Sequence, residues 1–154
     1  MASSTSIATQ PRHAATSLGP VILPSEWDQT APRAYVSTCF CFPLKEHNVD
    51  ALKKLERHLR ASIRSLAKQL PDLAGRLSVN PVGKLEFVPS KDRTIRFQFT
   101  VHRNQHRTYA ELKRRGFPQG ELLFLKLFDT PLVTGSIMVV RAVVIPGGLL
   151  LGIF

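Results

Sequence analysis

The sequence predicts an α/β fold built around one long amphipathic helix, and three features predict it. Leucine and isoleucine recur at three- and four-residue steps over residues 52–70, a spacing that places them on one face of a helix. Apolar and polar residues alternate over 94–101, which is typical of a half-exposed strand. The segment 137–154 is almost wholly apolar, and a proline followed by two glycines at 146–148 divides it into two core strands joined by a tight turn.

The composition is that of one globular domain with a strongly basic charge. The chain has 154 residues, enough for a single domain with a moderate core but too few for two full domains. Lysine and arginine number 21 against 11 acidic residues, so the net charge is +10 at neutral pH. Such an excess is typical of proteins that bind nucleic acid, a membrane surface or an anionic ligand such as a nucleotide-bearing cofactor. It also arises where an acidic partner surface is missing.

Residues 1–18 differ from the rest of the chain, because they are rich in serine, threonine and alanine and carry few charges. They contain no continuous apolar core, which a secretory signal would need. We therefore expect a disordered leader over 1–20 and a single folded domain over 21–154.

The first strand is expected at 35–42, where β-branched, aromatic and cysteine residues are concentrated. This segment is apolar on both faces, which favours a central position in a sheet. Its two cysteines, Cys39 and Cys41, are too close along an extended segment to form a disulfide. We expect buried free thiols in a reducing compartment, and so a cytoplasmic protein.

The long helix is expected to begin at Val49 and to end at Leu70. Asn48 can cap its start, and Asp50 places a negative charge in the first turn, where the helix dipole favours it. Leu70 precedes a proline and is therefore biased out of the helical region. Five basic residues share a face of this helix away from the apolar stripe: Lys53, Arg57, Arg60, Arg64 and Lys68.

The middle of the chain predicts short elements. A turn at 79–83 precedes a strand at 84–88, and the alternating residues of 94–101 form the next strand. Residues 109–115 predict a short helix, because Thr108 can cap its start and a glycine follows its end.

The apolar segment 132–154 is long enough to span a bilayer. Arg141 in its middle and the turn at 146–148 favour a soluble hairpin with strands at 137–145 and 149–154. A natural domain seldom stops on a run such as Leu-Leu-Leu-Gly-Ile-Phe, because chain ends usually lie at the polar surface. We therefore expect a chain truncated within a core strand, with neighbouring strands absent.

No complete catalytic or metal-binding motif is present. His102 and His106 are four residues apart, but no carboxylate or cysteine nearby completes a ligand set, and the Cys39–Cys41 pair has no second pair to join it. The sequence has no glycine-rich phosphate loop and no Gly-x-Ser-x-Gly motif. The basic helix face and the region 91–115 resemble a nucleic-acid-binding surface, yet they lack interleaved aromatic residues, so a solvated basic surface is the favoured interpretation.

Three sequence blocks carry a resemblance to a known family. Ser25-x-x-Asp28-Gln29 precedes the first strand, the long helix runs into Leu-Pro-Asp-Leu-Ala-Gly-Arg-Leu at 70–77, and Pro-Gly-Gly-Leu-Leu-Leu-Gly-Ile-Phe occupies 146–154. In this order they resemble the amino-terminal part of the BAHD-type acyl-CoA-dependent acyltransferases. The fungal, trichothecene 3-O-acetyltransferase-like branch is the most similar.

The resemblance implies a fold of two similar α/β domains, like chloramphenicol acetyltransferase, with a solvent channel between them. This chain would be an incomplete amino-terminal domain: part of a mixed sheet with one long helix, truncated at a C-terminal core strand. The full-length enzyme would move an acyl group from acyl-CoA, its co-substrate, to a hydroxyl or amine of a small secondary metabolite. No other cofactor, no metal, no nucleic acid and no membrane is expected.

The catalytic base of that family cannot be assigned in this chain. The family uses the histidine of a His-x-x-x-Asp motif to take the proton of the acceptor. None of the five histidines here has an aspartate four residues later. We therefore assign no catalytic residue and expect the chain alone to be inactive.

The resemblance does suggest substrate-binding positions. In the family, the strand after the Ser-x-x-Asp block helps to line the acceptor pocket, which corresponds to Tyr35, Val36, Thr38 and Phe40 of this chain. Val36, Thr38 and Phe40 share a strand face by the two-residue period, and they could equally be plain core residues.

Several residues of these sequence blocks are expected to be structural rather than catalytic. Gly75 would be required where the backbone is left-handed or too crowded for a side chain. Arg76 would pair with a carboxylate, such as that of Asp72, or with carbonyl groups. Asp28 and Gln29 are expected to be structural too. Two alternatives remain open at this point: a basic nucleic-acid-binding module, and a shortened, non-catalytic paralogue that pairs with a full-length relative through its open strands. The same open strands lead us to expect self-association or aggregation of the chain.

Overall fold

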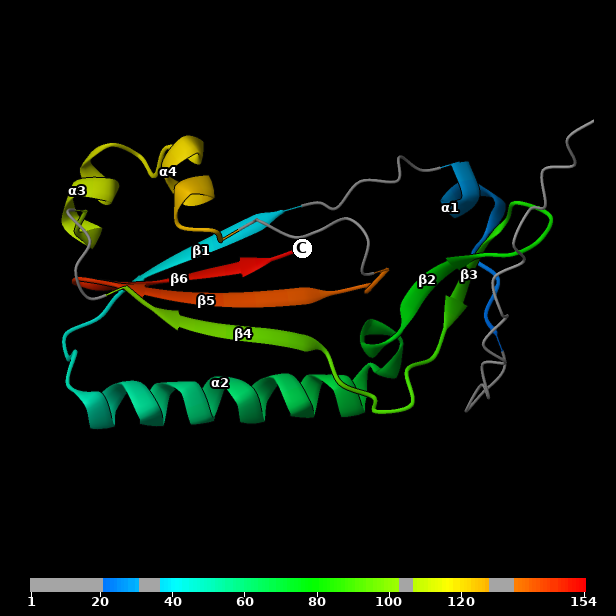
Figure 1. Ribbon diagram of the computed structural model, residues 1–154, viewed down its shortest axis with the longest axis horizontal. Coiled ribbons are helices and arrows are strands. Elements are labelled where there is room, and N and C mark those ends of the chain that lie inside the picture. The colour runs from blue at the N-terminus through cyan, green and yellow to red at the C-terminus, as the bar shows by residue number, and fades with distance from the viewer. Residues whose placement is uncertain (1–20, 31–36, 103–106, 128–134) are drawn as a thin grey trace, which may run out of the picture.

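The computed structural model describes residues 21–30, 37–102, 107–127 and 135–154. They form three layers, in which one long helix covers one face of a four-stranded sheet and two short helices cover the other face (Figure 1). A separate two-stranded sheet lies at one end of the molecule. The elements are α1 (Glu26–Thr30), β1 (Thr38–Pro43), α2 (Val49–Gln69), the 3₁₀ helix η1 (Pro71–Ala74), β2 (Arg76–Val79), β3 (Leu85–Val88), β4 (Arg96–Val101), α3 (Tyr109–Arg114), α4 (Gln119–Phe124), β5 (Val139–Ile145) and β6 (Gly148–Ile153).

The main sheet is mixed, with strand order β1-β6-β5-β4. Strand β6 is antiparallel to both of its neighbours, β1 and β5, and β4 is parallel to β5. The predicted C-terminal hairpin is confirmed, since β5 and β6 pair from Val140 opposite Ile153 to Ile145 opposite Gly148. No helix among the described residues is long and apolar enough to cross a membrane.

Two sequence-based expectations about strand position are wrong. Strands β5 and β6 were expected to lack neighbours, but they are the two inner strands of the sheet, with β4 and β1 beside them. Conversely, β1 was expected to be central and lies at an edge. The physical reason is that apolar residues on both faces of a strand indicate that other layers of the protein cover both faces. They do not indicate that another strand pairs with each of its two edges.

The core has two halves because the residues of β5 alternate between the two faces of the sheet. Ala142 and Val144 pack with Leu52 of α2, whereas Val143 and Ile145 pack with Leu112 of α3. Each fully buried aliphatic side chain contributes roughly 1.5–3 kcal/mol. Both halves of the core therefore depend on the same central strand.

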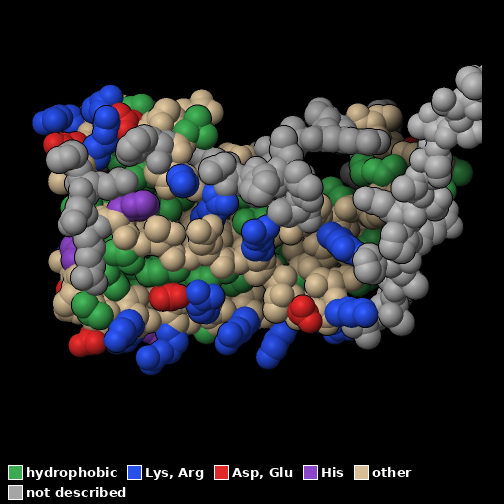
Figure 2. All heavy atoms as spheres, viewed as in Figure 1, with side chains coloured by type: hydrophobic (Ala, Val, Ile, Leu, Met, Phe, Trp, Pro, Cys, Tyr) green, Lys and Arg blue, Asp and Glu red, His purple; other side chains and the backbone are tan. Residues whose placement is uncertain are grey.

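Helix α2 has the predicted bounds. Asn48 caps it by accepting a hydrogen bond from the Ala51 N–H at 2.7 Å, and the helix ends before Leu70. The five basic residues of its outer face are exposed, as expected, and Figure 2 shows lysine and arginine side chains in a row over this helix. Arg60 bonds Glu56 at 2.7 Å and lies over the ring of Phe97.

The Leu-Pro-Asp-Leu-Ala-Gly-Arg block turns the chain from α2 into β2. Gly75 has an extended backbone with φ −79°, so the left-handed alternative is wrong. A Cβ atom at Gly75 would lie 2.9 Å from the carbonyl oxygen of Val88 and 3.1 Å from that of Asp72, so this position is crowded. Arg76 is exposed, and within the part of the chain that the structure describes it forms no ion pair with Asp72.

Other predicted and unpredicted elements complete the fold. The expectation that Gln29 is structural is confirmed, because its side-chain amide donates to the Leu85 carbonyl at 2.8 Å and accepts from the Leu85 N–H at 2.7 Å. Strands β3 and β4 and helix α3 lie within one or two residues of the predicted ranges. Helices α1, η1 and α4 and strand β2 were not predicted. The expected leader, residues 1–20, lies outside the described residues.

We predict that two glycines cannot be replaced by alanine without loss of stability. A Cβ atom at Gly148 would lie 2.6 Å from Cγ and 2.7 Å from Cβ of Tyr109, and Gly75 is crowded by the two carbonyl groups. Overpacking of this kind costs about 1–3 kcal/mol, so Gly75→Ala and Gly148→Ala should lower the urea midpoint of unfolding.

Gly120→Ala is the matched control, because no atom lies within 4 Å of a Cβ atom at this helical position. This variant should keep or slightly raise the midpoint. Equal midpoints for all three variants would show that the close approaches do not constrain the fold.

Candidate functional site

The predicted acceptor-lining strand is described only in part. Tyr35 and Val36 lie outside the described residues. Thr38 and Phe40 lie two residues apart on β1 and so share one face with Phe42. Both phenylalanines are 46% exposed, so the alternative that Phe40 is a plain core residue is wrong. The assignment of these residues to an acceptor pocket stays a prediction.

The exposed face of β1 continues onto β6. Phe40 is opposite Leu151 and Thr38 is opposite Ile153 in the antiparallel register, and directly opposed residues point to the same face. Leu151 also packs against the core cluster under α2. The exposed face of β1 therefore lies on the α2 side of the sheet, beyond the area that the helix covers. It offers an apolar surface to a ligand or to another polypeptide.

The other face of β1 carries the two cysteines. Both thiols are free and half-buried rather than buried, their sulfur atoms are 3.6 Å apart, and they pack against the core cluster around Leu112. Burial raises the pKa of Cys39 to about 12, with the hydrogen bond to Cys41 adding to the rise, and burial also raises the pKa of Cys41. Because the thiolate is the reactive form, neither cysteine is a nucleophile at neutral pH.

The structure does not test the pairing of His102 with His106. His106 lies outside the described residues, and His102 follows the end of β4. His102 and His47 line a hollow of about 370 Å³ at the hairpin end of the sheet. His47 uses its Nε2 atom to accept a hydrogen bond from the Gly147 N–H at 3.0 Å. Across the described ranges, no three histidine, cysteine or acidic side chains gather where a metal ion could bind.

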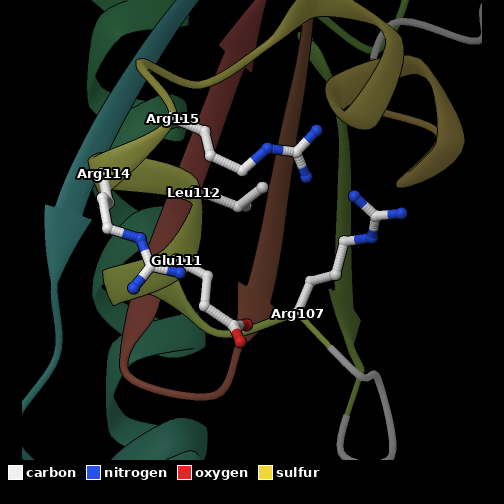
Figure 3. A pocket seen from close by; sticks show the side chains of 5 residues that line it. All are labelled: Arg107, Glu111, Leu112, Arg114 and Arg115. Carbon is white, nitrogen blue, oxygen red and sulfur yellow. The ribbon is translucent and has the colours of Figure 1, made fainter.

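A second hollow, of about 320 Å³, lies beside α3 and is lined mainly by arginine side chains (Figure 3). The guanidinium groups of Arg107 and Arg115 extend into the same space from two sides. We call it the arginine hollow, and its lining residues are Arg107, Glu111, Leu112, Arg114 and Arg115.

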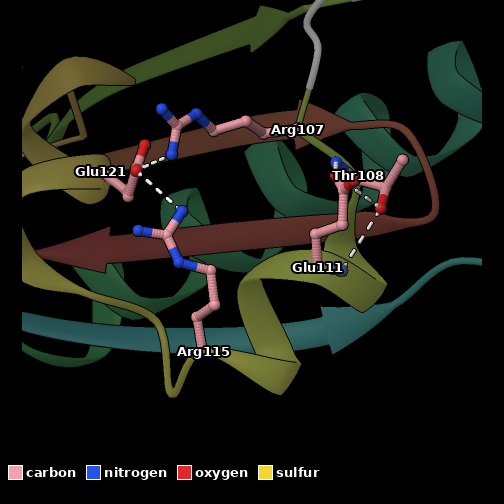
Figure 4. A network of polar contacts seen from close by, with 5 residues as sticks. All are labelled: Arg107, Thr108, Glu111, Arg115 and Glu121. Atoms are coloured by element: carbon pink, nitrogen blue, oxygen red, sulfur yellow. Dashed lines mark hydrogen bonds and ion pairs between the residues drawn. The ribbon is translucent and has the colours of Figure 1, made fainter.

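Two carboxylates hold the walls of the arginine hollow in place (Figure 4). The Glu121 side chain of α4, which is only 13% exposed, pairs with Arg107 and accepts from Arg115 at 3.1 Å through the same oxygen atom, Oε1. The Glu111 carboxylate accepts from the Thr108 N–H at 2.8 Å and from its hydroxyl at 3.1 Å. These hydrogen bonds from Thr108 lower the pKa of Glu111.

Sequence reasoning found the cap of this site and missed the hollow. Thr108 was predicted to cap α3, and it does so in a reciprocal capping box with Glu111. The convergence of Arg107 and Arg115 on Glu121 was missed because α4 was not predicted. The available signal was Pro118 at the start of α4, followed by an acidic residue in the first turn.

The Thr108 cap generates a pH-dependent prediction. Thr108→Ala removes the cap of α3 and should cost about 1 kcal/mol at neutral pH. The pKa of Glu111 is lowered from its ordinary value of 4.5, so its contribution is present above that value and is lost as pH falls through the folded-state pKa. Thr108→Ala removes the hydroxyl donor to this carboxylate and keeps the backbone N–H donor. The part of the stability difference between wild type and Thr108→Ala that comes from the hydroxyl donor should therefore be lost in acid, which chemical unfolding between pH 3 and pH 7 can measure.

Thr108→Ser is the matched control, because serine also caps well and should keep both the stability and its pH dependence. A difference between wild type and Thr108→Ala that stays constant down to the lowest pH would contradict the role of Glu111.

The cysteines generate a second prediction. Because burial raises both thiol pKa values, a thiol-specific reagent at neutral pH should label Cys39 and Cys41 much more slowly in the folded chain than in urea. Mass spectrometry after timed labelling measures both rates. Rapid labelling of the folded chain would show that β1 opens readily or that the sulfur atoms are accessible.

Comparison with known proteins gives a family and a fold. The sequence model of the Transferase family matches residues 14–99, more than half of the chain. No curated protein matches significantly in sequence. The structure is similar to TRI101 of F. sporotrichioides complexed with coenzyme A and T-2, with a TM-score of 0.72 and 18% identity, covering 88% of this chain and 34% of that one.

Two structures of TRI101 from F. graminearum are also similar to this chain. The complex with coenzyme A and T-2 mycotoxin has a TM-score of 0.72, and the apo structure has 0.68; each is 13% identical and covers 88% of this chain and 34% of that one. The chain thus spans about a third of the length of these proteins. At such low identities the likeness establishes the fold, which confirms a partial α/β domain of the expected kind.

Proposed function

Because this chain belongs to the Transferase family, we propose that it forms the amino-terminal part of an acyltransferase that uses acyl-CoA. The observation that carries the proposal is the agreement between the family match and the shared fold with TRI101, which is complexed with coenzyme A in several structures. The acceptor would be a hydroxyl or amine of a small secondary metabolite. Two free thiols also support a reducing, cytoplasmic compartment.

The reaction needs three things of the enzyme. An acceptor oxygen or nitrogen attacks the thioester carbonyl, a base takes the acceptor proton, and the bond to sulfur breaks so that the coenzyme leaves as a thiol. We propose that this chain contributes to the first requirement by providing one wall of the acceptor site. Thr38 can hydrogen-bond a polar acceptor, and Phe40 and Phe42 give apolar contact area that the fold leaves 46% exposed.

The chain does not supply the base of the proposed reaction. Its sequence contains no His-x-x-x-Asp motif. His47, which lies in a hollow, already uses its Nε2 atom to accept from the Gly147 backbone, so this atom is not available to take a proton from an acceptor. We therefore propose that the chain alone binds an acceptor weakly and does not turn it over.

We expect no acyl transfer from acetyl-CoA by the purified chain above the uncatalysed rate, since general-base assistance alone contributes roughly 10²–10⁴-fold. Thiol release from acetyl-CoA in the presence of an acceptor, followed with a thiol reagent, measures this. Turnover at ordinary enzyme rates of about 1–10³ s⁻¹ would contradict the proposal that the chain lacks a catalytic base.

The acceptor wall has its own test. Phe40→Ala should weaken binding of an apolar acceptor, with T-2 mycotoxin as the probe, by roughly tenfold, because a well-packed aromatic ring contributes more than 1.4 kcal/mol. Titration by NMR measures the dissociation constant. Val82→Ala is the matched control, since Val82 is 79% exposed at the β2–β3 turn. Equal effects of both variants would exclude β1 as the wall.

The exposed face of β1 also supports the alternative of a non-catalytic chain that associates with itself or a relative. The same variant separates the two functions. If Phe40→Ala abolishes concentration-dependent association in sedimentation experiments while leaving acceptor binding unchanged, the face is an interaction surface. If it weakens acceptor binding and leaves association unchanged, the face is the acceptor wall.

A further inference from the structure

We propose that the arginine hollow binds the phosphate groups of a small phosphorylated ligand. The hollow lies on the α3 side of the sheet, opposite the exposed face of β1. The proposal stands on the charges and geometry of the hollow and does not require acyl transfer by the chain.

The first argument is charge. Three guanidinium groups line the hollow, those of Arg107, Arg114 and Arg115. Among the residues that the structure describes, the carboxylates that face them are those of Glu111 and Glu121, which leaves one more positive than negative charge around the hollow. Glu111 is further committed to the cap of α3 through its hydrogen bonds to Thr108. An anion of matching size would relieve the repulsion between the guanidinium groups.

The second argument is pre-organisation. Arg107 and Arg115 both contact one oxygen atom of Glu121, so a nearly buried carboxylate holds two guanidinium groups close together. Each guanidinium has five N–H donors in a planar fork, and the contact to Glu121 involves one terminal nitrogen of each arginine, Nη1. The two side chains are 42% and 52% exposed, so an incoming ligand can reach the remaining donors. The ordering cost of bringing these long side chains together is thus met before a ligand arrives.

The third argument is the match to phosphate. Arginine forks bind phosphate oxygens in a bidentate manner, which gives both geometry and strength. A volume of about 320 Å³ is at the low end of the range of ligand sites, so it suits a phosphate or diphosphate group with a small attached moiety. The side chain of Leu112, which is fully buried, closes the hollow on the core side, and an apolar wall strengthens electrostatic contacts near it.

An ordinary surface ion-pair network explains the arrangement less well. Exposed ion pairs contribute only about 0–1 kcal/mol each, so stability alone is a weak reason for this arrangement. Here one arginine from before α3 and one that follows its last residue converge on one acidic residue of α4. This excess of guanidinium groups around a hollow indicates a binding role.

The test is titration of the folded chain with pyrophosphate and, separately, with coenzyme A, at low salt and with calorimetry as the readout. We expect saturable binding that weakens steeply as salt is added. Arg107→Gln combined with Arg115→Gln should weaken binding at least tenfold. Arg114→Gln should weaken it less and leaves the contacts to Glu121 in place, so it tests the site even if the double variant fails to fold. Arg64→Gln on the exposed face of α2 is the matched control and should change binding by less than twofold.

The outcomes separate the possible sources of phosphate. If pyrophosphate and coenzyme A both bind with the same dependence on the three arginines, the hollow recognises phosphate groups generally. If only coenzyme A binds in this way, the phosphates of the coenzyme are the ligand. Absence of saturable binding up to about 10 mM, equal binding by all variants, or much tighter arginine-dependent binding of an oligonucleotide would each overturn the proposal. The acyl-transfer assay can fail or succeed independently of these results.

Discussion

The burial of the β5–β6 hairpin on both faces is the constraint on which the rest of the structure depends. Almost every residue of β5 is buried, so neither face of the strand can be left to solvent. Helix α2 covers one face, and α3 and α4 cover the other. Arg141 is the half-buried exception within β5, and its guanidinium donates to the Lys126 carbonyl at 2.7 Å and lies over the ring of Phe154. The guanidinium group of Arg141 thus lies on the side of the short helices and stays out of the apolar core.

The hairpin also sets how closely the short helices approach the sheet. Gly148 leaves room for the ring of Tyr109, the first residue of α3, and Gly152 leaves room for Leu127 beyond α4. Larger residues at these two positions would push both helices outward. The positions of Arg115 on one side and Glu121 on the other follow from this approach. The arginine hollow is therefore a consequence of where glycine occurs in a buried strand, as well as of its own charges.

The periodic spacing of apolar residues predicted those elements whose pattern lies within one continuous segment of the chain. Helix α2 and strand β4 and the hairpin were found from the sequence because each repeats its pattern over enough residues to be unambiguous. Helix α4 has only six residues, fewer than two turns, and strand β2 has four, so neither shows a period. Strand order and edge position depend on contacts between distant segments, which is why β1 was misplaced. For the candidate site, the shared face of Thr38 and Phe40 follows from the two-residue period, whereas the meeting of Arg107 and Arg115 at Glu121 requires α3 and α4 to be adjacent in space.

The sheet separates the two surfaces to which we assign binding. The exposed face of β1 lies on the α2 side, and the arginine hollow lies on the α3 side. A ligand as small as pyrophosphate in the hollow cannot contact Phe40, because a layer of paired strands lies between them. Strand β1, however, is an edge of that sheet. A long ligand that is anchored by its phosphates in the hollow would have to pass an edge or an end of the sheet to reach the acceptor wall, and β1, which carries that wall, is one of the two edge strands.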